Sequence, residues 1–198
     1  MSNLNVTCGN LSAEKIQIDK NELAQRLKTS RDFQHSMVDL CIEEFNKVVD
    51  YRYAYMCVPV VFVDENICNL GFGDVESKNL CNVLKGCKKA LIVAVTTGLG
   101  VDRLLNKLSV TSASKHFITD AVASAAAESL CEYVDNMLRE NVDKPHRFSP
   151  GYGDLKLEIQ PNLLNMLSAS KNIGITINSS LLMTPVKSIT AIMGVCDE

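Results

Sequence analysis

The chain has 198 residues and a formal net charge of −3, and 46% of its residues are hydrophobic while 22% are charged. This composition is typical of a folded globular protein, and the small negative charge lacks the basic footprint of a nucleic-acid-binding protein. Because no apolar run reaches the roughly 18–20 residues of a membrane-spanning helix and the N-terminus lacks the pattern of a secretory signal, we expect a cytoplasmic protein.

The first half of the chain is predicted to combine helices with strands. Apolar residues at helical spacing indicate helices, and Asp19 is a suitable N-cap for the first of them. Stretches rich in β-branched and aromatic residues indicate strands. The predicted elements are a polar, frayed segment over 1–15, helices over 18–27, 30–49 and 76–84, one or two strands over 51–63, and a buried strand over 89–97.

The second half begins with a glycine-rich turn. Gly98 and Gly100 end the buried strand and lead into a helix that carries Val101. This arrangement resembles a phosphate-binding turn, but it lacks both G-x-G-x-x-G and the P-loop lysine, so the signal for phosphate binding is weak. Further predicted elements are the longest helix over 114–140, a helix over 157–169, and strands over 173–177 and 189–195.

The order of these elements bears on fold class and domain organisation. Helices and strands mix without regular β-α-β alternation, which favours an α+β fold. The chain has no low-complexity linker and no internal repeat. We predict an N-terminal extension with a short helix over residues 1–29, followed by one domain over residues 30–198.

Eight cysteines and three histidines show no metal-binding pattern. No C-x-x-C pair occurs, and no Cys–His cluster has the spacing of a zinc site. Several cysteines, such as Cys57 and Cys131, lie within apolar runs, where a free thiol behaves as a small hydrophobic group. We therefore expect buried, reduced thiols and no metal ligands, with a metal or redox site as the alternative.

The segment from Arg147 to Asp154 (Arg-Phe-Ser-Pro-Gly-Tyr-Gly-Asp) gathers several reactive groups on a sharply turned backbone. Pro150 fixes its own φ, and Gly151 permits a positive φ or the close approach of a ligand. Arg147 can hold a carboxylate or phosphate through paired hydrogen bonds, while Tyr152 offers an aromatic face and a hydroxyl. We interpret the segment as a candidate binding loop, with an ordinary Pro-Gly turn as the alternative.

Four segments together resemble the activation domain of cobalamin-dependent methionine synthase, in the form of its free-standing bacterial relatives. The similarity covers roughly residues 30–198, and R-x-x-P-G-Y is its most specific part. Where the fused domain follows G-Y with P-x-C-P, this chain has Gly153-Asp154-Leu155, as we expect of the free-standing branch. The other segments are TTGLGVDRL at 96–104, DAVASAAAESL at 120–130 and MTPVKSITA at 183–191.

The resemblance implies an α+β fold with a mixed, largely antiparallel sheet and several helices. It also implies a reactivation subunit that binds S-adenosylmethionine and supports reductive methylation of cob(II)alamin, a methyltransferase reaction. The implied partners are the cobalamin-binding core of methionine synthase, which carries the cobalamin, and a flavodoxin-like or other electron donor.

The resemblance also assigns site residues. In this family the arginine of R-x-x-P-G-Y grips the carboxylate of S-adenosylmethionine, and the backbone around P-G-Y lines the site. An acidic helix residue serves the site as well; Glu128 matches best, and Glu132 is the alternative. The implied cofactor-binding residues are Arg147, Ser149, Pro150, Gly151, Tyr152 and Glu128.

The chemistry of these side chains agrees with such a ligand, which carries a carboxylate, an ammonium and a sulfonium. Arg147 suits the carboxylate, Glu128 or Asp154 the ammonium, and Tyr152 the sulfonium through cation–π attraction. No Ser-His-Asp or Cys-His arrangement is evident, so we do not expect hydrolysis. The D-x-H-x-x-G motif of cobalamin-binding proteins is absent, so we expect cobalamin to arrive on a partner.

Two other functions compete with this interpretation. The chain could be a non-catalytic module that docks a corrinoid protein or senses S-adenosylmethionine. It could also be a structural or interaction protein in which the segment from Arg147 to Asp154 is only a surface loop. Ligand binding separates the last possibility from the others, and a reactivation assay separates the first two.

Overall fold

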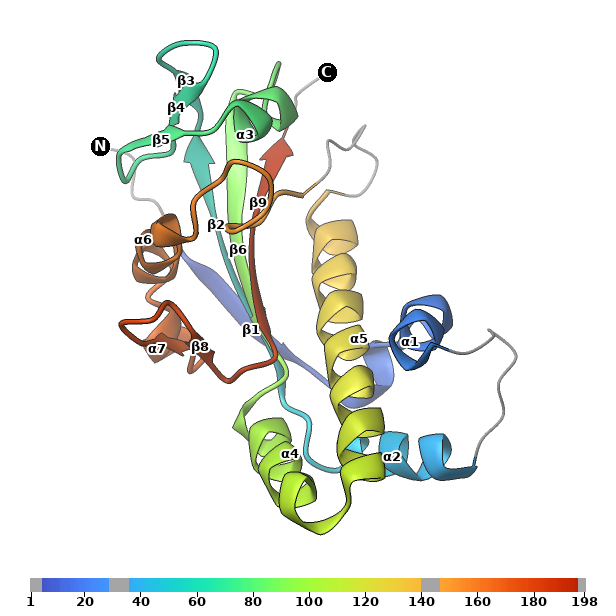
Figure 1. The fold of residues 1–198 in the computed structure, drawn as a ribbon. Coiled ribbons are helices and arrows are strands. Elements are labelled where there is room, and N and C mark those ends of the chain that lie inside the picture. The colour runs from blue at the N-terminus through green and yellow to red at the C-terminus, as the bar shows by residue number, and fades with distance from the viewer. Residues whose placement is uncertain (1–4, 29–35, 140–146, 196–198) are drawn as a thin grey trace.

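The computed structural model describes residues 5–28, 36–139 and 147–195. Within them, a four-stranded sheet in the order β1-β2-β6-β9 runs through the middle of the molecule with helices on both faces (Figure 1). All strand pairs are antiparallel. The strands of the main sheet are β1 (Thr7–Leu11), β2 (Tyr51–Pro59), β6 (Lys89–Thr96) and β9 (Ser188–Val195); two small sheets contain β3 (Val61–Phe62), β4 (Ile67–Asn69) and β5 (Asp74–Glu76), and β7 (Thr176–Ile177) and β8 (Met183–Thr184).

Together with these antiparallel sheets, the helices confirm the predicted α+β class. None of those described is long and apolar enough to cross a membrane. The helices are α1 (Lys20–Leu27), α2 (Ser36–Asn46), α3 (Lys78–Val83), α4 (Leu99–Thr111), α5 (Ala113–Leu138), α6 (Gln160–Met166) and α7 (Ala169–Asn172), with short 3₁₀ turns η1 (Ala13–Lys15) and η2 (Leu157–Ile159).

Strand β6 separates two hydrophobic cores. Successive side chains of a strand point to opposite faces of its sheet, and seven of the eight β6 residues are buried. The predicted buried strand is thus confirmed, and its continuous apolar run reflects burial on both faces. Ala90, Ile92 and Ala94 lie in the core shared with α3, α6 and α7, whereas Leu91, Val93 and Val95 lie in the core shared with α1, α2, α4 and α5.

A buried ion pair fixes the C-terminal end of α5 to β9. The side chain of Arg139 is 1% exposed and that of Asp135 is 8% exposed. Arg139 Nη2 donates to Asp135 Oδ2 at 2.8 Å, and Nη1 donates to the carbonyl oxygen of Gly194 at 3.0 Å. The guanidinium therefore joins the last turn of the longest helix to the edge strand of the main sheet.

The glycines after β6 are explained by close packing of two backbones. A Cβ on Gly100 would lie 2.2 Å from the carbonyl oxygen of Val48. Gly98 has φ of +87°, and the neighbouring Asp50 N–H donates to the carbonyl of Thr97 at 2.9 Å. Close packing against Val48 and Asp50 therefore accounts for this Gly-x-Gly.

The N-terminal segment differs from the sequence prediction. Instead of fraying, residues 7–11 form β1, which pairs with β2 at the edge of the main sheet. Its side chains are mostly exposed, so the strand lacks the apolar alternation that reveals most strands. The predicted helix start at 30–32 lies outside the described residues, and the division into residues 1–29 and 30–198 stays a prediction.

Other short elements were also predicted incorrectly. The strands β4, β5 and β8 were missed. The helix predicted over 157–169 is interrupted at Ser168, whose φ of 46° is left-handed, so that α6 and α7 are separate helices. A left-handed residue breaks the hydrogen-bond ladder that a single helix would need.

The prediction of buried, reduced thiols holds for only part of the cysteines described. Cys8 and Cys57 are exposed, and Cys87 is disulfide-bonded. No cluster of three or more His, Cys, Asp and Glu side chains that could hold a metal occurs among the described residues. The free, buried thiols are those of Cys41, Cys68, Cys81 and Cys131.

Candidate functional site

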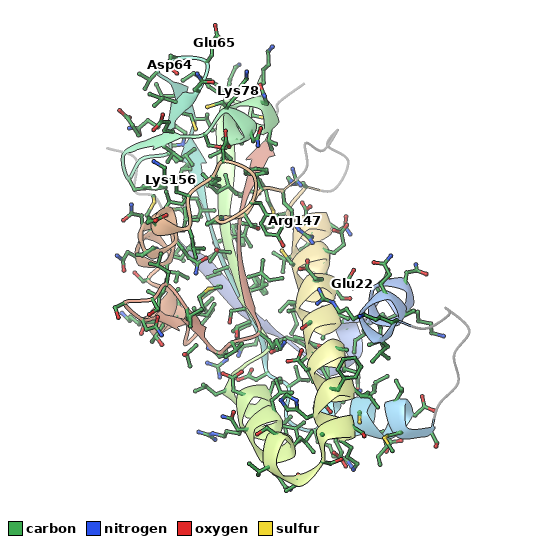
Figure 2. The ribbon with its side chains drawn as sticks, in the orientation of Figure 1. Glu22, Asp64, Glu65, Lys78, Arg147 and Lys156 are labelled. Atoms are coloured by element: carbon green, nitrogen blue, oxygen red, sulfur yellow. The ribbon has the colours of Figure 1, made fainter. Side chains whose placement is uncertain are left out.

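The site loop, residues 147–155, runs beside β9 and the C-terminal half of α5. Its first anchor is Phe148, which exchanges two backbone hydrogen bonds with Ile192 of β9, at 2.9 and 2.8 Å. This bridge extends the main sheet by one residue pair. Figure 2 shows the side chain of Arg147 at the C-terminal half of α5.

The turn itself is closed by backbone hydrogen bonds. The N–H of Tyr152 donates to the carbonyl of Ser149 at 3.2 Å, and the N–H of Gly151 donates to that of Leu155 at 2.9 Å. Gly151 has φ of +89°, a conformation that a residue with a Cβ rarely adopts. Leu155 is buried in the core, so the turn is held at both ends.

Asp154 is the second anchor of the loop. Its carboxylate accepts hydrogen bonds from the Ser77 hydroxyl, from the N–H of Lys78 at 2.9 Å and from the N–H of Asn79 at 3.3 Å. These bonds, led by that from Ser77, hold the pKa of Asp154 below its usual value. The carboxylate therefore caps α3, which argues against our suggestion that Asp154 could meet a ligand ammonium.

Arg147 is bound by two carboxylates from α5. Its Nη2 donates to Glu128 Oε2 at 2.7 Å, and its Nη1 donates to Glu132 Oε2 at 3.0 Å. Glu128 and Glu132 are one helical turn apart and so lie on one face of α5. The two glutamates that the sequence offered as alternatives therefore both contact the arginine.

The surroundings of Arg147 keep it charged. Burial lowers the pKa of its guanidinium, but the negative charges around it, those of Glu128 and Glu132 among them, raise it above its usual value. Burial raises the pKa of the Cys131 thiol to about 12, so this thiol is neutral at physiological pH. The charged groups that meet at this end of the loop are thus the Arg147 cation and the carboxylates of Glu128 and Glu132.

Two cavities meet at Arg147 and Glu128, which line both of them. The smaller, of about 490 Å³, lies over the site loop and β9 and has the size of a small-molecule site. The larger, of about 1100 Å³, lies between α5 and the segment 15–22 and includes Glu132. The smaller cavity is lined by Glu128, Arg147, Phe148, Ser149, Pro150, Tyr152, Gln160, Met183, Ser188, Ile189 and Thr190.

The structure brings most of the predicted site residues together. Five of the six line the smaller cavity, whereas Gly151 does not line it and belongs to the turn through its positive φ. Sequence reasoning missed Gln160, which is buried and accepts a hydrogen bond from Thr190 at 3.3 Å. The binding roles of all these residues stay predictions.

Comparison with known proteins supports the fold. No protein-family model matches the chain, and no curated protein matches it at a significant level. Among solved structures, it is similar to the crystal structure of the MetH reactivation domain bound to AdoHcy, with a TM-score of 0.72 and 15% sequence identity, over 98% of this chain and 79% of that one. The chain has the fold of the MetH reactivation domain, which confirms the fold that the sequence resemblance predicts.

Proposed function

We propose that the chain binds S-adenosylmethionine in the 490 Å³ cavity and serves as the reactivation subunit of a cobalamin-dependent methionine synthase. The observation that carries the proposal is the position of Arg147 and Glu128. On a chain with the fold of the MetH reactivation domain, these two residues lie in the same cavity as Ser149, Pro150 and Tyr152.

The charges of the cavity fit the amino-acid end of this ligand. A guanidinium holds a carboxylate through two parallel hydrogen bonds, and Arg147 offers such a fork at the cavity wall. Glu128 contacts Arg147 there, and its carboxylate suits the ligand ammonium. The ligand carries both a carboxylate and an ammonium, so its contacts with Arg147 and Glu128 can replace the ion pair that it breaks between these two residues.

The rest of the cavity is mixed in polarity. Tyr152 is 66% exposed at its rim, where its aromatic face suits a sulfonium through cation–π attraction. Thr190 and Gln160 add polar groups, while Met183 and Ile189 add apolar ones. Such a lining suits a ligand that joins an amino acid to a nucleoside.

In this proposal S-adenosylmethionine supplies the methyl group, and the acceptor is cobalamin held on a partner, the core of methionine synthase. A flavodoxin-like or other donor supplies the electron for reductive methylation. The role of this chain is to bind and orient the methyl donor. The isolated protein is expected not to retain cobalamin through gel filtration, and its cytoplasmic location stays a prediction.

Isothermal titration calorimetry with S-adenosylmethionine tests the binding site. We expect Arg147→Ala to lose most of the affinity, and Arg147→Lys to lose part of it, because lysine keeps the charge without the fork. Thermal melts verify that the variants are folded. Parent-like affinity of Arg147→Ala would show that the site is elsewhere.

The reactivation role needs a second assay. A methionine synthase without its own activation domain is oxidised to the cob(II)alamin form and then incubated with this chain, S-adenosylmethionine and an electron donor. We expect activity to return with the parent protein and not with Arg147→Ala. Ligand binding without any return of activity would instead indicate a module that senses S-adenosylmethionine or docks a corrinoid protein.

A further inference from the structure

We propose that Glu128 and Glu132 make this site selective for the positively charged methyl donor over its demethylated product. The inference rests on the proposed function, because it concerns the same cavity. It gives a specificity role to Glu132, which contacts Arg147 but does not line the 490 Å³ cavity.

The charges in contact with Arg147 do not balance. Of the described residues that line the smaller cavity, Arg147 and Glu128 are the ones with a charge, and they neutralise each other. Glu132 adds a second carboxylate on the same guanidinium. Among the groups in contact with Arg147, one formal negative charge is therefore left over.

The remaining charged groups described nearby do not line the smaller cavity, and several of them line the larger one. Asp135, on the same helix, is paired with Arg139. On the wall of the larger cavity, Glu22 is paired with Arg26 at 2.7 Å, and Lys15, Asp19 and Lys20 lie on the same wall. Among the groups in contact with Arg147, the excess negative charge therefore belongs to the two glutamates.

The two glutamates contact different nitrogen atoms of the guanidinium. Glu132 binds Nη1 from the side of the larger cavity, whereas Glu128 binds Nη2 and lines both cavities. A ligand carboxylate that takes the place of Glu128 on Arg147 leaves Glu132 in position to hold the guanidinium. It also frees the carboxylate of Glu128 to face the positive groups of the ligand.

The donor and the product form a matched pair for this question. S-adenosylmethionine carries a net charge of about +1, and S-adenosylhomocysteine, which lacks the methyl group and the sulfonium charge, is about neutral. All contacts to the amino-acid and nucleoside parts are shared, so the ratio of the two dissociation constants isolates the sulfonium. A site with an excess negative charge favours the donor and releases the product once the charge has gone.

The expected size of the effect is moderate. The side chains of Glu128 and Glu132 are 36% and 59% exposed, so solvent screens them, and exposed charge pairs contribute little. We expect the parent to prefer the donor by about tenfold, and the loss of either carboxylate to reduce that preference by about threefold, at low ionic strength.

Calorimetric titrations of both ligands on the parent, Glu128→Gln and Glu132→Gln test the proposal. Glutamine keeps the shape and removes the charge. Glu44→Gln is the matched control, because Glu44 pairs with Lys115 near the other end of α5, about 20 Å away along the helix. The preference should fall in Glu132→Gln and Glu128→Gln, stay unchanged in Glu44→Gln, and weaken as salt is added.

A third ligand separates charge from the methyl group. Sinefungin carries a protonated amine in place of the sulfonium, so it should bind to the parent like the donor and lose affinity in Glu132→Gln. A preference that is equal in the parent and in both glutamine variants would overturn the proposal and leave the proposed function intact. A parent that binds none of the three ligands would overturn both.

Discussion

Removing the side chain of Arg139 should test how firmly α5 is held against β9. In Arg139→Ala the carboxylate of Asp135 stays in a site where the residue is 6% exposed, and it loses both of its guanidinium bonds. The carbonyl of Gly194 loses a donor as well. Breaking a buried ion pair by removing one member typically costs about 3–5 kcal/mol of unfolding free energy, because a charge is left buried without compensation.

This cost corresponds to a large shift in melting temperature. For a protein of this size, 1 kcal/mol lowers Tm by about 2–4 °C, so we expect Arg139→Ala to melt about 6–20 °C below the parent. Urea titration gives the free energy directly, since the midpoint falls while the slope stays constant in a two-state transition. Arg26→Ala is a suitable control, because its ion pair with Glu22 is partly exposed and should cost less than about 1 kcal/mol.

A double variant separates lost charge from lost packing. Replacing both members in Asp135→Leu/Arg139→Met removes both charges of the pair, and such apolar replacements are often neutral or stabilising. We therefore expect the double variant to recover at least half of the loss. A cost below 1 kcal/mol for Arg139→Ala, or a double variant less stable than the single one, would refute this reasoning.

Three further predictions follow from backbone geometry and from one pKa. Gly151→Val and Gly86→Val should lower the free energy of unfolding by similar amounts, because φ is +89° at Gly151 and +85° at Gly86. Calorimetry should show weakened S-adenosylmethionine binding only for Gly151→Val. Equal effects of the two variants on binding would show that the turn is not part of the site. Because the pKa of Asp154 is lowered in the folded protein, its contribution to the free energy of unfolding is complete above about pH 5. That contribution is lost as the pH falls through the folded-state pKa, which lies below the unfolded value of about 3.9. Asp154→Asn should therefore flatten the acid side of a plot of Tm against pH, and an unchanged acid side would contradict the cap. Gly100→Ala should destabilise by about 1–3 kcal/mol in urea titrations, because its Cβ would meet the carbonyl of Val48 at 2.2 Å; a stabilised variant, as helix propensity alone predicts, would show that the two backbones can separate.

The sequence predicted the elements that carry their own signal. The β6 run is buried on both faces and therefore reads as apolar throughout. Asp19 caps α1 as predicted, accepting hydrogen bonds from the N–H groups of Asn21 and Glu22. In both cases the information lies within a few residues of the element itself.

Features that depend on partners far away in the sequence were not predicted. β1 is polar and short, and it is a strand only because β2, more than 40 residues later, offers it an edge. In the same way, nothing near Asp154 indicates that it caps a helix 76 residues earlier in the chain. Composition and periodicity describe a segment and its immediate neighbours, so they do not identify such partners.

The same distinction between local and distant information applies to the residues of the candidate site. Arg147 and the Pro-Gly turn were found because their residue types are unusual together. Whether Glu128 or Glu132 contacts the arginine depends on the rotation of α5 about its axis, and the structure answers that both do. Gln160 escaped notice because a glutamine at the start of a helix has no distinctive pattern.

The attachment of the site loop to α3 has a consequence for how the protein opens. α3 has six residues, too few to hold its first turn without capping groups, and the amides of Lys78 and Asn79 donate to Asp154. When the loop lifts away, these amides lose their acceptors, so the loop and the first turn of α3 should exchange hydrogen for deuterium as one cooperative unit. A small molecule that holds the loop in place would then protect amides on a helix that does not line its cavity.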